Sequence, residues 1–169
     1  MDEGWTRYLF DHYQFDYRRV EADGIRDGAL DDLNVVLFPD DDLDALKGEG
    51  ELPAPGEGER DEYPEMFVPP RYREGLDDDA IDRLKSWTRD GGTLVLLGDA
   101  WELAARELGV PVENAVAGLP DTVFYSPGST LRAVFDPDHP LTWGMPAEGL
   151  VLNWDSPALR IDRSSFNGR

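Results

Sequence analysis

Two short, unbroken apolar runs constrain what this chain can fold into more than any other feature. Residues 34–38 read Asn-Val-Val-Leu-Phe and residues 93–97 read Thr-Leu-Val-Leu-Leu, and turn residues follow both runs. Runs of this length with turn residues around them are typical of strands buried on both faces of a parallel sheet. We therefore expect two buried strands of a parallel sheet at these positions.

A helix is predicted between the two runs. Residues 77–79 are three aspartates, which suit a helix N-terminus, and residues 91–92 are two glycines, which suit its end. Ile81, Leu84 and Trp87 recur at helical spacing and predict a stripe that faces inward. Strand, helix and strand in this order imply a βαβ crossover and an α/β domain with a doubly wound, mainly parallel sheet.

Weaker patterns flank this unit. Further helices are expected at residues 3–13 and 100–108, and further strands at residues 15–21, 112–116, 131–135 and 150–154. The first helix has Asp2 as its expected N-cap and an apolar stripe of Trp5, Tyr8, Leu9, His12 and Tyr13.

A long acidic insertion is expected at about residues 39–76. Its central part, residues 48–65, is rich in Gly, Pro and Glu. Loops of this length and composition are usually functional or disordered, so we expect partial disorder, with residues 66–72 docking back onto the body.

The net charge excludes several classes of partner. Thirty-six acidic residues against sixteen basic ones give a formal charge of −20. Such a surface repels phosphate backbones and anionic lipid, so nucleic-acid binding is not expected. No run approaches the roughly 20 apolar residues that span a bilayer, so no membrane insertion is expected. A solvated acidic surface is the simplest interpretation of the charge.

Metal-ligating residues are scarce. Cysteine is absent and the histidines are His12 and His139, whereas a zinc site made from protein side chains takes three or four ligands. His12 lies on the apolar side of the first helix and His139 lies in a turn-like Asp-Pro-Asp-His-Pro segment. The acidic run at residues 40–44 lacks the spacing of an EF-hand loop and supports at most superficial cation binding. We expect no metal or other cofactor in this chain.

The best position for a nucleophile lacks one. In doubly wound sheets, ligands and nucleophiles lie where strands end and helices begin, and here that position holds Gly98 and Asp99. A nucleophile elbow would place Ser or Cys between glycines. Asp99 is interpreted as a helix N-cap, with a general base as the alternative. Ser126 has no evident histidine partner and lies in a turn-like segment, and no phosphate-binding glycine motif follows a strand.

Aromatic residues offer a second kind of site. Tyr125, Trp143 and Trp154 are candidates to line a ligand pocket at the strand ends, with core packing as the alternative. The candidate site residues are therefore Gly98, Asp99, Tyr125, Ser126, Trp143 and Trp154, and none is assigned a catalytic role.

Five segments in their order and spacing resemble a known family. They are residues 1–7 (Met-Asp-Glu-Gly-Trp-Thr-Arg), 69–75 (Pro-Pro-Arg-Tyr-Arg-Glu-Gly), 91–95 (Gly-Gly-Thr-Leu-Val), 125–132 (Tyr-Ser-Pro-Gly-Ser-Thr-Leu-Arg) and 139–146 (His-Pro-Leu-Thr-Trp-Gly-Met-Pro). Together they resemble the C-terminal domain of bacterial zinc carboxypeptidases of the carboxypeptidase A-like family. That domain is similar to class I glutamine amidotransferases, which have a flavodoxin-like three-layer α/β sandwich.

The resemblance implies a single amidotransferase-like domain over residues 1–169 that lacks the first strand of the fold and is a fragment. It implies a parent zinc carboxypeptidase in the periplasm or outside the cell, whose zinc ligands belong to a separate N-terminal catalytic domain. Working amidotransferases place their cysteine after the strand that matches residues 93–97, where this chain has Gly98 and Asp99. Glutaminase chemistry is therefore not expected.

Two functions follow as hypotheses from different classes. The first is a non-catalytic accessory domain that stabilises or positions the catalytic carboxypeptidase domain. The alternative is a free-standing module that binds a sugar or a peptide. A missing central strand would leave unpaired strand edges, which predicts a homodimer or strand exchange. The compartment of the chain itself is left open.

Overall fold

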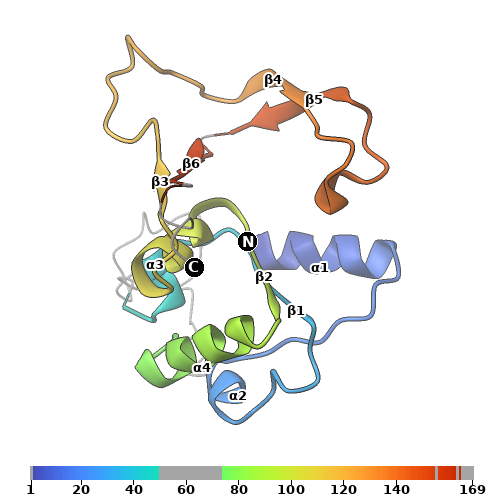
Figure 1. The fold of residues 1–169 in the computed structure, drawn as a ribbon, viewed down its shortest axis with the longest axis vertical. Helices are drawn as coiled ribbons and strands as arrows, with labels where there is room; N and C mark the ends of the chain where they lie inside the picture. Colours follow the sequence, from blue (N-terminus) through green and yellow to red (C-terminus); the bar gives the residue numbers. More distant parts are fainter. Residues whose placement is uncertain (1, 50–73, 155, 163, 165–169) are drawn as a thin grey trace, which may run out of the picture. The chain divides into compact units, whose positions relative to one another are not determined.

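The computed structural model describes residues 2–49, 74–154, 156–162 and 164 (Figure 1). The chain divides into two compact units, Met1–Pro111 and Val112–Arg169. Helices and a parallel strand pair make up the first unit, whereas the second contains antiparallel strand pairs and loops. The predicted mixed α/β class is therefore confirmed, while one amidotransferase-like domain over the whole chain stays a prediction. Among the described helices, none is long and apolar enough to cross a membrane.

The first unit is built around a parallel pair of strands. β1 (Val35–Phe38) and β2 (Thr93–Leu96) pair in register from Val35 opposite Thr93 to Phe38 opposite Leu96. Both strands were predicted from their apolar runs, and α4 (Asp78–Arg89) connects them as the predicted crossover helix. The βαβ unit is therefore confirmed.

Helix α4 follows the predicted pattern closely. The Asp77 side chain caps its start by accepting a hydrogen bond from the Ala80 N–H, at 2.9 Å. Ile81, Leu84 and Trp87 are buried. Because these residues lie on one side of the helix, α4 faces the core with the expected stripe and exposes its acidic side.

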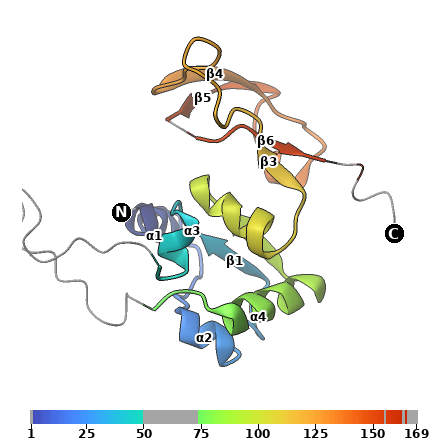
Figure 2. The same ribbon diagram turned by 90° about the vertical axis from the view of Figure 1, so that its left-hand side faces the viewer.

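The core of the first unit lies between α4 and one face of the strand pair. α2 (Ala22–Arg26) lies next to α4 on the same side of the sheet (Figures 1 and 2). The buried cluster consists of Ile25, Leu30, Leu43, Leu76, Ala80, Ile81, Leu84, Trp87 and Leu103. Alternate strand residues, Val36, Phe38, Leu94 and Leu96, pack against it.

The ends of the acidic insertion belong to this core. α3 (Leu43–Leu46) lies within the range predicted as insertion, and Leu43 and Leu76 are both buried. The Leu76 N–H donates to the Leu46 carbonyl at 2.8 Å, so the chain segments at the two ends of the acidic insertion lie side by side. Both ends of the predicted range 39–76 therefore contribute apolar side chains to the core, and its boundaries stay a prediction. The expected disorder at 48–65 falls almost wholly outside the described residues, and the expected docking of 66–72 does so entirely.

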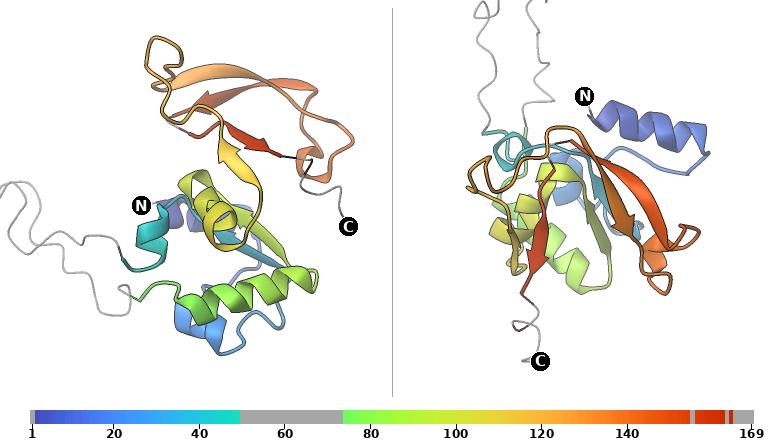
Figure 3. Two further views of the ribbon diagram at one scale, coloured as in Figure 1. Left: turned by 60° about the vertical axis from the view of Figure 1, so that its left-hand side comes forward. Right: turned by 90° about the horizontal axis from the view of Figure 1, so that it is seen from above.

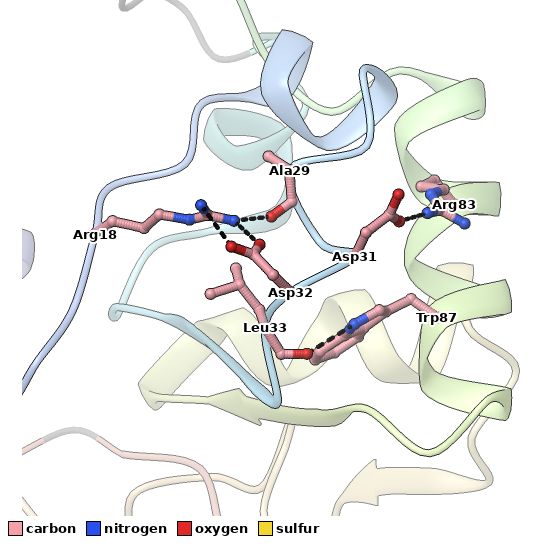
Figure 4. A network of polar contacts seen from close by, with 7 residues as sticks. All are labelled: Arg18, Ala29, Asp31, Asp32, Leu33, Arg83 and Trp87. Carbon is pink, nitrogen blue, oxygen red and sulfur yellow. Dashed lines mark hydrogen bonds and ion pairs between the residues drawn. The ribbon is translucent and has the colours of Figure 1, made fainter.

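Polar contacts fix the connection between α2 and β1. They join Arg18 to Ala29 and Asp32, Arg83 of α4 to Asp31, and the indole N–H of Trp87 to the Leu33 carbonyl (Figure 4). The indole bond measures 3.3 Å and comes from a buried side chain. Helix α4 therefore contacts the segment that precedes β1 as well as the core.

α1 (Asp2–His12) was predicted, but the strand expected at residues 15–21 is wrong. Residues 15–21 are irregular, and Phe15 and Tyr17 pack their rings against Phe10 of α1 instead, at centroid distances of 5.5 and 5.4 Å. The alternation of apolar residues in this segment is satisfied by local aromatic packing, so it needs no neighbouring strand.

The helix predicted at 100–108 is divided. A 3-10 turn, η2 (Gly98–Ala100), follows β2 directly and is succeeded by a wide helical turn, η3 (Leu103–Glu107). Ala100 and Leu103 are the buried residues of this segment. The helical region therefore begins two residues earlier than expected.

The second unit consists of two antiparallel pairs (Figure 3). β4 (Ser129–Val134) and β5 (Glu148–Asn153) form a hairpin from Ser129 opposite Asn153 to Val134 opposite Glu148. β3 (Val112–Asn114) pairs with β6 (Leu159–Ile161). The expected strands at 112–116, 131–135 and 150–154 are confirmed, with shifted ends.

A mainly parallel sheet is not confirmed. Of the three sheets in the described residues, one is parallel and two are antiparallel. In the described residues of the second unit no α-helix connects the strands, and they pair antiparallel, β4 with its neighbour β5 and the first strand β3 with the last strand β6. In the first unit β1 and β2 bond directly to each other, which leaves no open position between them for a missing central strand.

Candidate functional site

The carboxyl ends of β1 and β2 meet at a corner formed by Asp40, Gly98 and Asp99, here called the strand-end corner. The Leu97 N–H donates to the Phe38 carbonyl at 3.1 Å and carries the pairing to the end of both strands. Beyond it, the Asp99 N–H donates to Asp40 Oδ1 at 2.7 Å. The sequence therefore placed Gly98 and Asp99 correctly at the strand ends, where doubly wound sheets hold ligands.

Gly98 allows the carboxylate of Asp40 to reach the Asp99 amide. Its φ is 50°, in the left-handed region that favours glycine. A β-carbon at position 98 would stand 2.0 Å from the Asp40 carboxylate carbon. The corner is therefore filled by a side chain of the protein itself.

Asp99 is not the N-cap of the helical segment, contrary to the sequence interpretation. The cap position is held by Leu97, without a side-chain hydrogen bond, and Asp99 is the second residue of η2. Asp40 supplies the capping carboxylate from the neighbouring strand end. The capping role of Asp40 could be found in the sequence only from its position, since residue 40 and residue 99 each follow an apolar strand.

The aspartates after β1 make structural contacts. Asp42 caps α3 by accepting from the Ala45 N–H at 2.7 Å, and Asp41 accepts from the Asp42 N–H at 3.1 Å. Partial burial of its carboxylate, with added repulsion from Asp42 and Asp40, raises the pKa of Asp41, whereas the bond from the Asp42 amide acts in the opposite direction. Over the described part of the chain, no group of three acidic or histidine side chains is placed to hold a metal ion.

Three candidates of the second unit lie at one end of the β4–β5 hairpin. The Ser126 hydroxyl donates to the Asn153 side-chain carbonyl at 3.1 Å. The indole of Trp154 covers Gly128, where an added β-carbon would stand 2.8 Å from the ring. Tyr125 is exposed beside Ser126. Asn153 and Gly128 were missed, because their contacts with Ser126 and Trp154 span 26 to 27 residues.

Trp143 does not join these residues. It is 92% exposed and lies between η4 (Pro140–Thr142) and β5, at the opposite end of the hairpin from Trp154. The six-residue ladder between the two ends is about 17–20 Å long. The proposed aromatic lining is therefore reduced to Tyr125 and Trp154, and core packing is wrong for all three aromatics since each is exposed.

The two histidines have separate local roles. The His12 ring stacks on Tyr8 at 6.1 Å on an exposed side of α1, and His139 Nδ1 accepts from the Leu141 N–H at 3.2 Å. His139 therefore lies in a turn, as predicted.

Comparisons of the chain with protein-family models, with curated proteins and with solved structures find no match. In the described residues the strand-end corner and the end of the β4–β5 hairpin are therefore the candidate functional sites.

Proposed function

We propose that this chain is a non-catalytic accessory domain of a zinc metallocarboxypeptidase, with a structural or positioning role toward the separate catalytic domain. One observation carries the non-catalytic part of the proposal, namely that the Asp40 carboxylate accepts from the Asp99 N–H at the strand-end corner. In an acyl-transfer enzyme, free backbone amides near such a corner would stabilise a developing oxyanion. Here a carboxylate already accepts from this amide.

The charge at the corner argues in the same direction. Asp40, Asp41, Asp42 and Asp99 follow the two strand ends, and they bring negative charge to the place where an oxyanion would form. Like charges destabilise an anionic intermediate, so this corner disfavours acyl transfer. Neither Gly98 nor Asp99 offers a hydroxyl or thiol nucleophile.

The amidotransferase-like, flavodoxin-like fold is part of the same proposal. The parallel β1–α4–β2 unit supports it. A flavodoxin-like order would place a further strand between the second and third strands of the fold. The proposal therefore requires β1 and β2 to separate and accept that strand when the parent supplies it.

Two experiments test the proposed function. The first reads the codons that flank this sequence, where we expect an upstream catalytic domain that carries an H-x-x-E zinc motif. An adjoining sequence without such a domain contradicts the carboxypeptidase assignment. The second incubates the purified chain with peptide and glutamine substrates, where we expect no turnover. Turnover that disappears in Asp99→Asn would overturn the non-catalytic role.

The end of the β4–β5 hairpin favours a second candidate function, a module that binds a sugar or a peptide. Trp154 is 74% exposed although its ring covers Gly128, so the rest of its surface is open to solvent. Ser126 and Asn153 offer hydrogen-bonding groups nearby. Aromatic side chains with a few adjacent polar groups are the usual components of small-ligand sites.

Intrinsic tryptophan fluorescence separates this candidate from the first. If a glycan or peptide quenches or shifts the emission, the response is expected to disappear in Trp154→Phe and to persist in the control Trp143→Phe. An unchanged response in Trp154→Phe, or none from the unaltered chain across neutral glycan and peptide panels, contradicts the ligand-binding role at this place.

A further inference from the structure

Helix α1 carries an exposed aromatic face. Its members share one side of the helix and its immediate end, at spacings of three and four residues, and they are Trp5, Tyr8, Leu9, His12 and Tyr13. Trp5, Tyr8, Leu9 and Tyr13 are 63%, 57%, 51% and 68% exposed. Isolated apolar residues on a surface are ordinary, whereas a contiguous aromatic stripe marks an interaction site.

The opposite side of α1 is fastened to the chain that follows it. Phe10 packs against Phe15 and Tyr17, and the Tyr17 hydroxyl donates to Asp11 at 2.9 Å. Arg19 pairs with Glu3 at 3.5 Å. The aromatic face therefore points outward because the other side of the helix is already held.

Contacts along the face order its side chains before any partner arrives. Trp5 and Tyr8 meet edge to face at 6.0 Å, Tyr8 stacks on His12 at 6.1 Å, and His12 meets Tyr13 at 4.9 Å. Side chains that are already ordered lose less conformational entropy on binding. The face is accordingly suited to a direct, helix-against-helix contact.

The local charge allows a second copy of this chain to approach this face. The chain carries a net charge of −20, yet residues 2–19 contain four acids and three arginines and contribute −1 of it. Two copies of so acidic a chain repel each other over most of their surface. Around α1 that repulsion is weaker than around the rest of the described first unit, where residues 21–49 contribute −8 and residues 74–111 contribute −5, and an apolar face is available there to offset it.

We propose that α1 is a homodimer interface, in which two copies pack their aromatic faces together around a two-fold axis near Tyr8 and Leu9. Antiparallel pairing about this axis places Trp5 of one copy beside His12 of the other, so the same patch serves both copies. If each of the five side chains buries on the order of 100 Å², the total is roughly 1,000 Å², at the lower end of specific interfaces. This inference does not rest on the accessory-domain function.

Sedimentation velocity of the purified chain tests the interface. We expect a reversible dimer at about 100 µM protein, which Leu9→Glu weakens by at least about tenfold in dissociation constant. The matched control is Leu141→Glu, because Leu141 is 83% exposed in the second unit and its replacement introduces the same charge. We expect that control to leave the dimer unchanged.

A second variant keeps the test independent of folding. If far-UV circular dichroism shows that Leu9→Glu loses helix, Tyr13→Glu replaces it, since Tyr13 lies beyond the last residue of α1 and is exposed. Raising NaCl to about 300 mM is expected to tighten the dimer by screening the repulsion between the copies. A monomeric chain, equal weakening by Leu141→Glu, or a dimer loosened by salt overturns the proposal.

Discussion

The carboxylate of Asp40 lies where a side chain at position 98 would stand, so these two residues, 58 positions apart, determine the shape of the strand-end corner. The Asp40 carboxylate accepts a hydrogen bond from the Asp99 N–H, next to Gly98 in the chain. The hydrogen bond at the strand-end corner therefore requires glycine at position 98, after β2, and an acidic side chain at position 40, after β1.

Replacing Gly98 by Ala is expected to destabilise the first unit by more than backbone strain alone. Gly109→Ala is the matched control, because Gly109 also has a positive φ, 69°, but has no atom within 4 Å of an added β-carbon. We expect about 1 kcal/mol for Gly109→Ala and about 1–3 kcal/mol more for Gly98→Ala in the free energy of urea unfolding. Adding Asp40→Ala to Gly98→Ala is expected to recover part of that excess, and equal effects of the two glycine changes contradict the overlap.

Gly92 gives a purely steric test, since its φ lies outside the left-handed region while a β-carbon there would stand 2.4 Å from the Trp87 ring. We expect Gly92→Ala to cost about 1–3 kcal/mol in unfolding free energy, because Trp87 is buried and cannot move aside freely. The Trp87 indole also donates to Leu33, so its displacement is expected to change the near-UV circular dichroism. A variant within about 0.5 kcal/mol of the unaltered chain contradicts this packing.

Replacing Leu43 tests whether the start of the acidic insertion belongs to the core. Its side chain is 6% exposed, and we expect Leu43→Ala to cost about 2–4 kcal/mol in the unfolding of the first unit. Leu84→Ala, at 0% exposed, is the reference for a central core position, and Leu150→Ala, at 76% exposed, is the control. If Leu43→Ala lowers the free energy of unfolding as little as Leu150→Ala does, the start of the acidic insertion lies outside the core.

The sequence predicted the elements whose signals are local. Trp87 and its neighbours on α4 follow helical spacing, and Asp77 is a capping residue directly before them, so both could be identified from a few adjacent residues. β1 and β2 were likewise recognisable from their apolar runs.

Long-range contacts could not be predicted in the same way. The bond between Asp40 and Asp99 spans 59 residues, and the bond between Ser126 and Asn153 spans 27. Phe15 and Tyr17 alternate as a strand would, but their rings pack on Phe10. Spacing along the chain reports which side of an element a residue occupies, whereas pairing across elements depends on the loops that connect them. The sequence therefore indicated where the candidate site residues lie along the chain, but not which residues they contact.

Asp77 predicts how acid weakens the first unit. The hydrogen bond from the Ala80 N–H, followed by the one from Arg26, lowers the pKa of Asp77. A lowered folded-state pKa stabilises the fold above the ordinary value near 4, and this contribution is lost as pH falls through the folded-state pKa. Asp77→Asn keeps a capping oxygen but does not titrate. We expect the stability difference between the unaltered chain and this variant to shrink as unfolding is measured from pH 7 down to about pH 3, and a constant difference contradicts the linkage.

Asp41 predicts the opposite sign. Burial, with the nearby Asp42 and Asp40, raises the pKa of its carboxyl group, so the folded chain binds this proton more tightly than the unfolded chain does. The contribution of Asp41 is therefore most favourable below the ordinary value near 4 and is lost as pH rises through the raised folded-state value. Asp41→Asn keeps an acceptor for the Asp42 N–H and removes the charge, so we expect it to raise the free energy of urea unfolding at pH 7. That gain is expected to fade once the pH falls through the same window. A variant that is less stable than the unaltered chain at pH 7 would mean that the negative charge of Asp41 stabilises the turn after β1.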